Sequence, residues 1–204
     1  MKTWFVFPLL VILLVPVIIP DVLGHGFGID EAPSISFDNR NVTVSTKLSP
    51  SDLTVGDIEN AFVQVRFFDV DTNQTINDVT YGIEMWRKGE LLARNDFYAV
   101  NGIMTIDVRP TYDCNNLQLW RCTNYYGVMH PIAGALYTYG NSNPVIQGPI
   151  FDKGGLYNIK VSVLGAESPK TLLTTPLKFE LYTSVAQEQI FYITVPIEQI
   201  SNVE

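Results

Sequence analysis

The chain has 204 residues, of which 47% are hydrophobic and 17% charged, and its formal net charge is −8 at pH 7. An acidic chain without a cluster of lysine and arginine argues against nucleic acid and anionic lipid surfaces as partners. The length suits a single domain with a sizeable core after removal of a leader.

Residues 1–24 have the pattern of a signal peptide. Lys2 supplies the charged start, and the apolar run 4–20 follows it. Prolines interrupt this run, which is shorter than the roughly 20 apolar residues that a membrane span needs. Small residues stand where a signal peptidase would cut before His25. We therefore expect an exported protein whose mature domain is residues 25–204. The alternative is that the leader stays as an anchor helix at the outer face of the cytoplasmic membrane.

The mature part alternates apolar and polar residues with the period of two that is typical of β-strands. This pattern predicts strands at 41–48, 61–68, 80–87, 91–98, 103–108, 157–164, 172–182, which Pro176 breaks, and 189–195. Lys88-Gly89 predicts a turn between two of them, and Asn101-Gly102 gives the strongest hairpin signal because both residues tolerate the positive φ of a type I′ turn. The pattern predicts an all-β fold, an immunoglobulin-like two-sheet sandwich, with Tyr157 as a structural tyrosine at the entry to a late strand.

One segment, residues 109–144, breaks this rhythm and is too long for an ordinary connection, so we expect an insertion loop there. In an exported chain, Cys114 and Cys122 predict a disulfide that pins the loop. A two-thiolate metal site is the alternative, although this spacing matches no common zinc pattern. The segment is rich in aromatic residues, which favours a binding surface. The other interpretation is a lid over an open end of the sandwich.

Three stretches resemble exported β-sandwich proteins of ammonia-oxidising archaea. They are residues 67–102, residues 148–161 and the HGFG sequence that begins at His25. The resemblance implies export and an immunoglobulin-like sandwich, and it implies no established activity.

A cut before His25 would create a candidate copper site. The free α-amine and the ring Nδ1 of His25 would chelate one metal, and His130 would supply a second imidazole, with Met129 or Tyr137 as the axial ligand. This arrangement, the histidine brace, occurs in lytic polysaccharide mono-oxygenases and in certain periplasmic copper carriers, and the HG start is similar to that of the former. The alternative is that both histidines are ordinary residues.

A second candidate metal site begins at Asp69, where oxygen ligands alternate as in a calcium loop and Asp78 follows. Gln74 stands where an EF-hand requires glycine, and Thr80 stands where it requires a bidentate glutamate. The segment is therefore better interpreted as a polar turn between two strands.

Asn41 and Asn73 begin glycosylation sequons and are candidate modification sites. The sequence contains no nucleophile elbow and no glycine-rich phosphate loop. The leading hypothesis is therefore a non-enzymatic extracytoplasmic module that binds a protein or surface partner at the cell envelope. A copper carrier or accessory factor is the alternative, and a copper-dependent mono-oxygenase is a weaker one.

Overall fold

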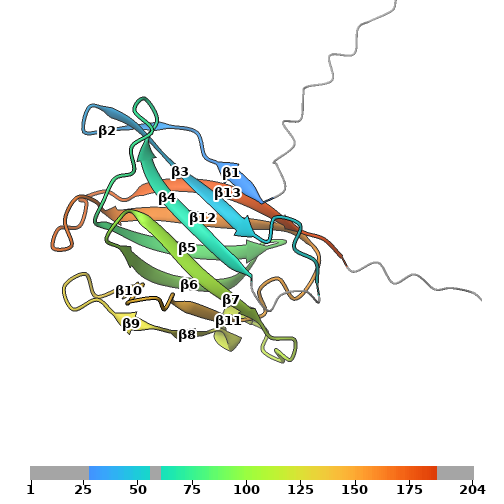
Figure 1. The fold of residues 1–204 in the computed structure, drawn as a ribbon. Helices are drawn as coiled ribbons and strands as arrows, with labels where there is room; N and C mark the ends of the chain where they lie inside the picture. Colours follow the sequence, from blue (N-terminus) through green and yellow to red (C-terminus); the bar gives the residue numbers. More distant parts are fainter. Residues whose placement is uncertain (1–27, 56–60, 188–204) are drawn as a thin grey trace, which may run out of the picture.

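The computed structural model describes residues 28–55 and 61–187, and these form two β-sheets packed face to face (Figure 1). The first sheet has the order β1-β3-β4-β7-β11-β8, with β2 beside β3. Its strands are β1 (Ile29–Glu31), β2 (Ile35–Phe37), β3 (Arg40–Ser49), β4 (Phe62–Asp69), β7 (Ile103–Pro110), β8 (Asn124–Tyr126) and β11 (Val145–Gly148).

The second sheet has the order β13-β12-β5-β6-β10-β9. Its strands are β5 (Val79–Arg87), β6 (Glu90–Ala99), β9 (Val128–Met129), β10 (Leu136–Tyr137), β12 (Gly155–Gly165) and β13 (Leu177–Val185). A short 3-10 helix, η1 (Leu119–Cys122), lies beside β6. No helix in the described ranges is long and apolar enough to cross a membrane.

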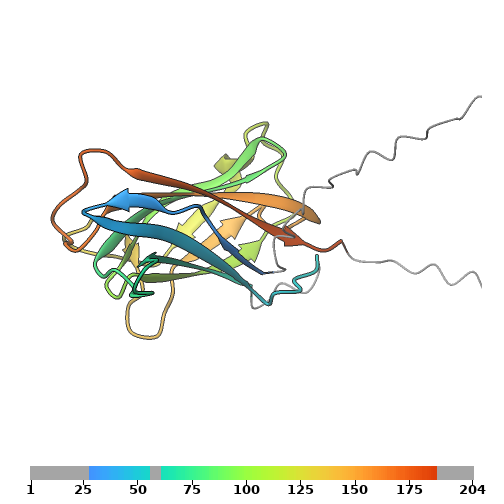
Figure 2. The same cartoon turned by 90° about the horizontal axis from the view of Figure 1, so that it is seen from above.

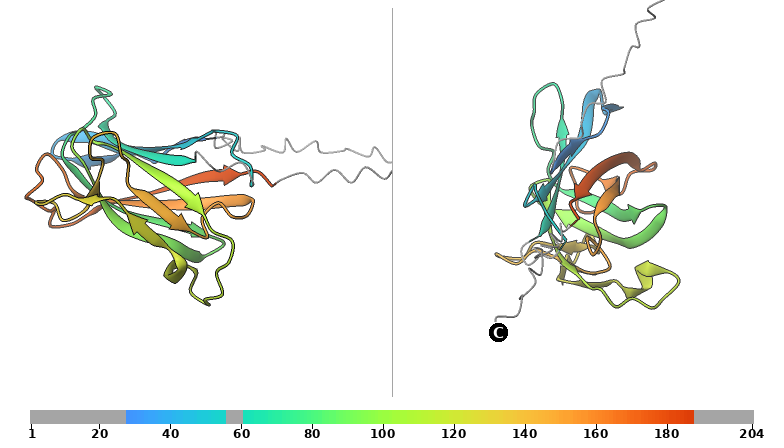
Figure 3. Two further views of the ribbon diagram at one scale, coloured as in Figure 1. Left: turned by 60° about the horizontal axis from the view of Figure 1, so that its bottom comes forward. Right: turned by 90° about the vertical axis from the view of Figure 1, so that its right-hand side faces the viewer.

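The chain passes repeatedly between the sheets, which confirms the predicted immunoglobulin-like sandwich. β3 and β4 pair in the first sheet, β5 and β6 pair in the second, β7 returns to the first, and β12 and β13 pair in the second. Figure 2 and Figure 3 show the two layers from above and from other sides. The predicted strand at 189–195 and the whole leader lie outside the described residues.

The predicted hairpin at Asn101-Gly102 is wrong in one respect, because the strands on its two sides belong to different sheets. β6 pairs with β5, whereas β7 pairs with β4. Gly102 has a φ of +72°, but the positive φ of a type I′ turn is absent at Asn101. The two-residue turn with positive φ at both positions lies at Lys88-Gly89 instead, with φ values of 49° and 81°, and it joins β5 to β6.

The core fills the space between the sheets with alternate residues of the long strands. In β12, for example, Tyr157, Ile159, Val161 and Val163 are buried, whereas the residues between them are partly exposed. The largest fully buried side chains of the described residues include Tyr81, Tyr98, Tyr157, Phe67, Phe97 and Phe151. Apolar burial of this extent provides the main driving force for folding.

Tyr157 has the structural role that the sequence predicts for it. Its hydroxyl donates to the carbonyl of Lys153 at 2.7 Å, which ties the start of β12 to the preceding turn. The Arg87 guanidinium donates to the Tyr157 hydroxyl at 3.0 Å and to the Asp152 carboxylate at 2.6 Å. Arg87 and Asp152 are both buried, so each provides the charge partner that the other requires.

Residues 109–144 are more regular than the predicted insertion loop. They contain η1 and three short strands: β8 extends the first sheet beside β11, and β10 and β9 extend the second sheet beside β6. The predicted disulfide between Cys114 and Cys122 is present in the part of this segment that precedes β8. Disulfides persist in oxidising compartments, so this bond indicates an environment outside the cytoplasm.

Candidate binding sites

Side chains from residues 109–144 complete the hydrogen bonding of the β6 edge. The hydroxyl of Thr123 donates to the carbonyl of Leu92 at 2.6 Å. Two residues further along β6, the amide of Arg94 donates to the hydroxyl of Tyr125 at 2.7 Å. Burial raises the pKa of that tyrosine. The segment is thus attached to the sandwich by side chains that occupy the positions of a neighbouring strand's backbone.

The same segment carries most of the exposed large apolar side chains. Thirteen such residues are exposed among those described, and eight of them lie between residues 109 and 144. These eight are Tyr112, Leu117, Trp120, Tyr126, Val128, Met129, Ile132 and Tyr139. We call them the apolar segment surface. Isolated apolar residues are normal on a protein surface, and the concentration of eight of them in residues 109–144 makes this segment the candidate interaction site.

β8 and β9 place part of this surface at one side of the sandwich. β8 is the edge strand of the first sheet, β9 is the edge strand of the second, and Gly127 lies between them in the chain. A Cβ at Gly127 would lie 3.3 Å from the Cα of Pro144, and its φ is +148°, so glycine suits this close crossing. The segment therefore runs from the edge of one sheet to the edge of the other.

His130 lies within this segment, in a turn that follows β9. Its Nδ1 accepts hydrogen bonds from the amides of Ala133, at 3.1 Å, and Ile132, at 3.4 Å. Its ring lies 4.4 Å from the ring of Tyr98 and 5.0 Å from that of Tyr137, measured between centroids. Because Nδ1 is an acceptor for the turn, Nε2 carries the ring N–H and is the nitrogen left to donate a hydrogen bond.

The predicted copper site is only partly within the described residues. His25 lies outside them, so the pairing of His25 with His130 stays a prediction. Of the two predicted axial ligands, Tyr137 contacts the His130 ring, whereas Met129 pairs in register with Leu136 on the neighbouring strand. The described residues contain no group of three or more His, Cys, Asp or Glu side chains placed to hold a metal.

Tyr98 connects His130 to the sandwich. It is buried in β6, and its hydroxyl donates a short hydrogen bond to the Asp78 carboxylate. Burial, followed by this bond to Asp78, raises the pKa of Tyr98 above its usual value. The phenol therefore stays protonated, and its hydrogen bond to Asp78 holds the ring in contact with His130.

The predicted calcium loop forms a polar turn between β4 and β5. The Asp69 carboxylate accepts hydrogen bonds from the amides of Asp71, at 2.9 Å, and Thr72, at 3.0 Å. The Asp71 carboxylate accepts one from the side chain of Asn41 at 3.1 Å. These carboxylates thus bind the local backbone and a neighbouring strand. This arrangement agrees with the interpretation of the segment as a polar turn.

The two sequons have different surroundings, although both asparagines are exposed. The Asn41 side-chain nitrogen donates to Asp71, and Thr43, the third residue of its sequon, is fully buried with its hydroxyl bonded to the Ala32 carbonyl at 2.6 Å. Asn73 lies at the turn after β4, where its side-chain oxygen accepts from Arg66 at 3.1 Å. Whether either site carries a glycan stays a prediction.

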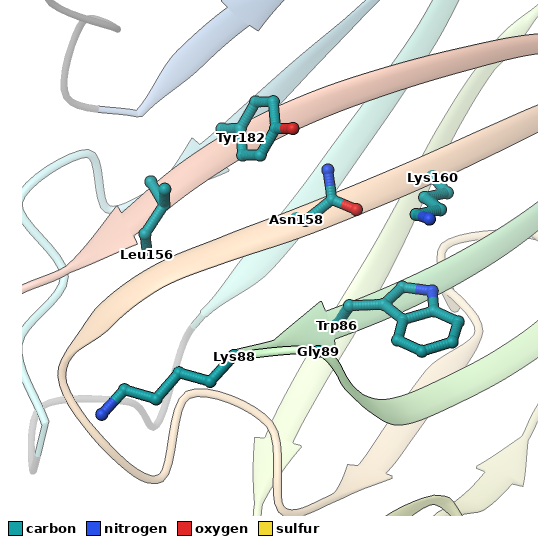
Figure 4. Close-up of a pocket in the computed structure, with 7 residues that line it drawn as sticks. All are labelled: Trp86, Lys88, Gly89, Leu156, Asn158, Lys160 and Tyr182. Carbon is teal, nitrogen blue, oxygen red and sulfur yellow. The ribbon is translucent and has the colours of Figure 1, made fainter.

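Sequence reasoning missed a pocket of about 310 Å³ on the outer face of the second sheet. Figure 4 shows its seven lining residues, which come from three neighbouring strands and a turn. They are Trp86, Lys88, Gly89, Leu156, Asn158, Lys160 and Tyr182. The sequence feature that could have indicated this pocket is the alternation of inward-facing and outward-facing residues along β5. Tyr81, Ile83 and Met85 occupy the core face of β5, so Trp86 is a large aromatic residue in the outward phase.

Comparisons of the chain with protein-family models, with curated proteins and with solved structures find no match.

Proposed function

We propose that this protein is a non-enzymatic binding module outside the cytoplasm, and that it holds a protein partner through the apolar segment surface. The observation that carries the proposal is the concentration of eight of thirteen exposed large apolar residues in residues 109–144. Aromatic residues and methionine are enriched at the centres of protein interfaces, and this surface contains both.

The attachment of the segment also supports an interface. Thr123 and Tyr125 bond to β6, and the disulfide closes the part that contains Trp120. A surface held in one conformation loses little conformational entropy on binding, which favours affinity. A lid over the sandwich end would instead turn its large apolar side chains inward.

Site-specific photo-crosslinking in intact cells of the native host tests this proposal. A photoreactive amino acid at Val128, which is 44% exposed, reports on the apolar segment surface. The same amino acid at the exposed Lys178 on β13 is the control position, at the opposite edge of the second sheet. We expect a discrete protein adduct from position 128 and none from position 178. Equal crosslinking from both positions, or none from position 128, would contradict the proposal.

A further inference from the structure

The pocket on the outer face of the second sheet is built from a row of side chains that face each other across strands. Asn158 on β12 lies directly opposite Tyr182 on β13 and opposite Trp86 on β5, and Trp86 lies opposite Leu91 on β6. In Figure 4, Asn158 lies between the strands that carry the two aromatic residues, and Leu156 marks one end. An amide is thus flanked by aromatic and aliphatic surface.

Trp86 is held in one orientation before any ligand arrives. Its indole N–H donates to the Glu84 carboxylate at 3.0 Å. The Lys160 ammonium lies 5.1 Å from the centre of its ring, within the range of a cation–π contact. A half-buried tryptophan fixed in this way offers rigid apolar surface with little entropy left to lose on binding.

Two cations on this face of the sheet are paired with carboxylates of the same face. The Lys160 ammonium lies 3.4 Å from the Glu180 carboxylate, and the Arg94 guanidinium lies 3.6 Å from that of Glu84. The four residues lie opposite one another on neighbouring strands, in the order Glu180, Lys160, Glu84 and Arg94, so negative and positive charges alternate along the row. Lys160, one of the two cations that line the pocket, is thus neutralised, which leaves the pocket without the cluster of positive charge that recognition of a polyanion requires.

The polar groups suit hydroxyl ligands. The Asn158 side-chain nitrogen donates to the Leu181 carbonyl at 3.3 Å, which fixes the amide and leaves its oxygen as an acceptor. A purely apolar ligand would bury this oxygen without a partner, at a cost in free energy. A ligand with both an apolar face and hydroxyl groups at its edge avoids this cost.

We propose that this pocket binds one pyranose ring of a carbohydrate. A pyranose presents C–H groups on its faces, which can contact Trp86 and Leu156, and hydroxyl groups at its edge, which can bond with Asn158 and Lys160. The volume of about 310 Å³ lies at the lower end of the range for ligand pockets, which suits a single sugar unit rather than a large cofactor. The site lies apart from residues 109–144 and does not depend on the partner proposed for them.

Calorimetric titration of the full chain tests this site with four soluble hexasaccharides: cellohexaose, chitohexaose, mannohexaose and hexagalacturonate. We expect at least one to bind with a Kd below about 10 mM, and Trp86→Ala and Asn158→Ala to weaken binding about tenfold or more. Trp86→Tyr keeps an aromatic ring and should retain part of the affinity. Leu172→Ala, a change at a 66% exposed apolar residue outside the pocket and outside residues 109–144, is the matched control and should leave the affinity unchanged.

The same titrations show whether the pocket prefers a neutral or an acidic sugar. Binding of a neutral hexasaccharide is expected to be insensitive to salt, whereas binding of hexagalacturonate alone, weakened by salt and by Lys88→Ala, would assign an acidic sugar. Unfolding curves of each variant show whether the fold is retained. Failure of all four hexasaccharides to bind, or binding that survives Trp86→Ala and Asn158→Ala, would overturn the proposal.

Discussion

Gly102 shows how one residue fixes the passage of the chain between the two sheets. Its carbonyl accepts a hydrogen bond at 2.6 Å from Tyr81, whose ring is fully buried in the core. Burial raises the pKa of this tyrosine, so the hydroxyl remains a donor throughout the usual pH range. A Cβ at Gly102 would lie 1.8 Å from the carbonyl oxygen of Ile76, which is closer than two atoms can approach without bonding.

Gly102→Ala is expected to destabilise the protein much more than Gly89→Ala. Both glycines have positive φ, at +72° and +81°, so both substitutions have the left-handed backbone cost of about 1–2 kcal/mol. A Cβ at Gly89 meets nothing within 4 Å, whereas one at Gly102 must displace the backbone of Ile76. We expect an additional loss of about 2 kcal/mol or more for Gly102→Ala. Urea unfolding measures both, and equal losses would show that the close approach is unimportant.

Among the elements, β6 and β11 connect the sandwich to the segment that carries the apolar segment surface, β11 through its pairing with β8. Part of the β6 edge is paired with β10, and part is satisfied by Thr123 and Tyr125. Gly148 on β11 makes room for this arrangement, because a Cβ there would lie 2.3 Å from the Thr123 hydroxyl oxygen. The position of the segment therefore depends on these side-chain contacts with β6 as well as on the short ladders of β8 with β11 and of β10 with β6.

Thr123→Val tests this attachment because it keeps the shape of the side chain and removes the donor to Leu92. The buried carbonyl of Leu92 then loses its partner, which we expect to cost about 1–3 kcal/mol in the free energy of unfolding. Thr123→Ser keeps the hydroxyl and should cost less than the valine substitution. Hydrogen exchange should quicken across residues 119–126 in Thr123→Val. A valine variant as stable as the wild type, with unchanged exchange, would refute the role of this bond.

At the scale of the whole molecule, the sequence predicts the long strands well and the short ones poorly. Alternation over eight or more residues identifies β3, β4, β5 and β12, because one face of each is buried. β9 and β10 have two residues each, which is too short for any period to be visible. The turn at Asn101-Gly102 was misassigned because local turn chemistry does not indicate which sheet the next strand joins.

The candidate sites also differ in how far the sequence alone predicts them. The disulfide and the aromatic character of residues 109–144 were predictable from composition and spacing. The pocket around Trp86 was not, because it requires the register that places Asn158 between Trp86 and Tyr182. The surroundings of His130 were also not predictable from the sequence, because Tyr98, which contacts its ring, comes from another part of the chain.

Size-exclusion chromatography of native envelope extracts tests whether the apolar segment surface holds a partner. The test variant changes three exposed residues of that surface to serine: Val128, Met129 and Ile132. The matched control changes three equally apolar residues outside the surface: Val70, Val100 and Leu172, which are 40%, 57% and 66% exposed. We expect the wild type and the control to elute in the same complex, and the test variant to elute as a folded single chain. Co-elution of all three in the same complex would contradict it.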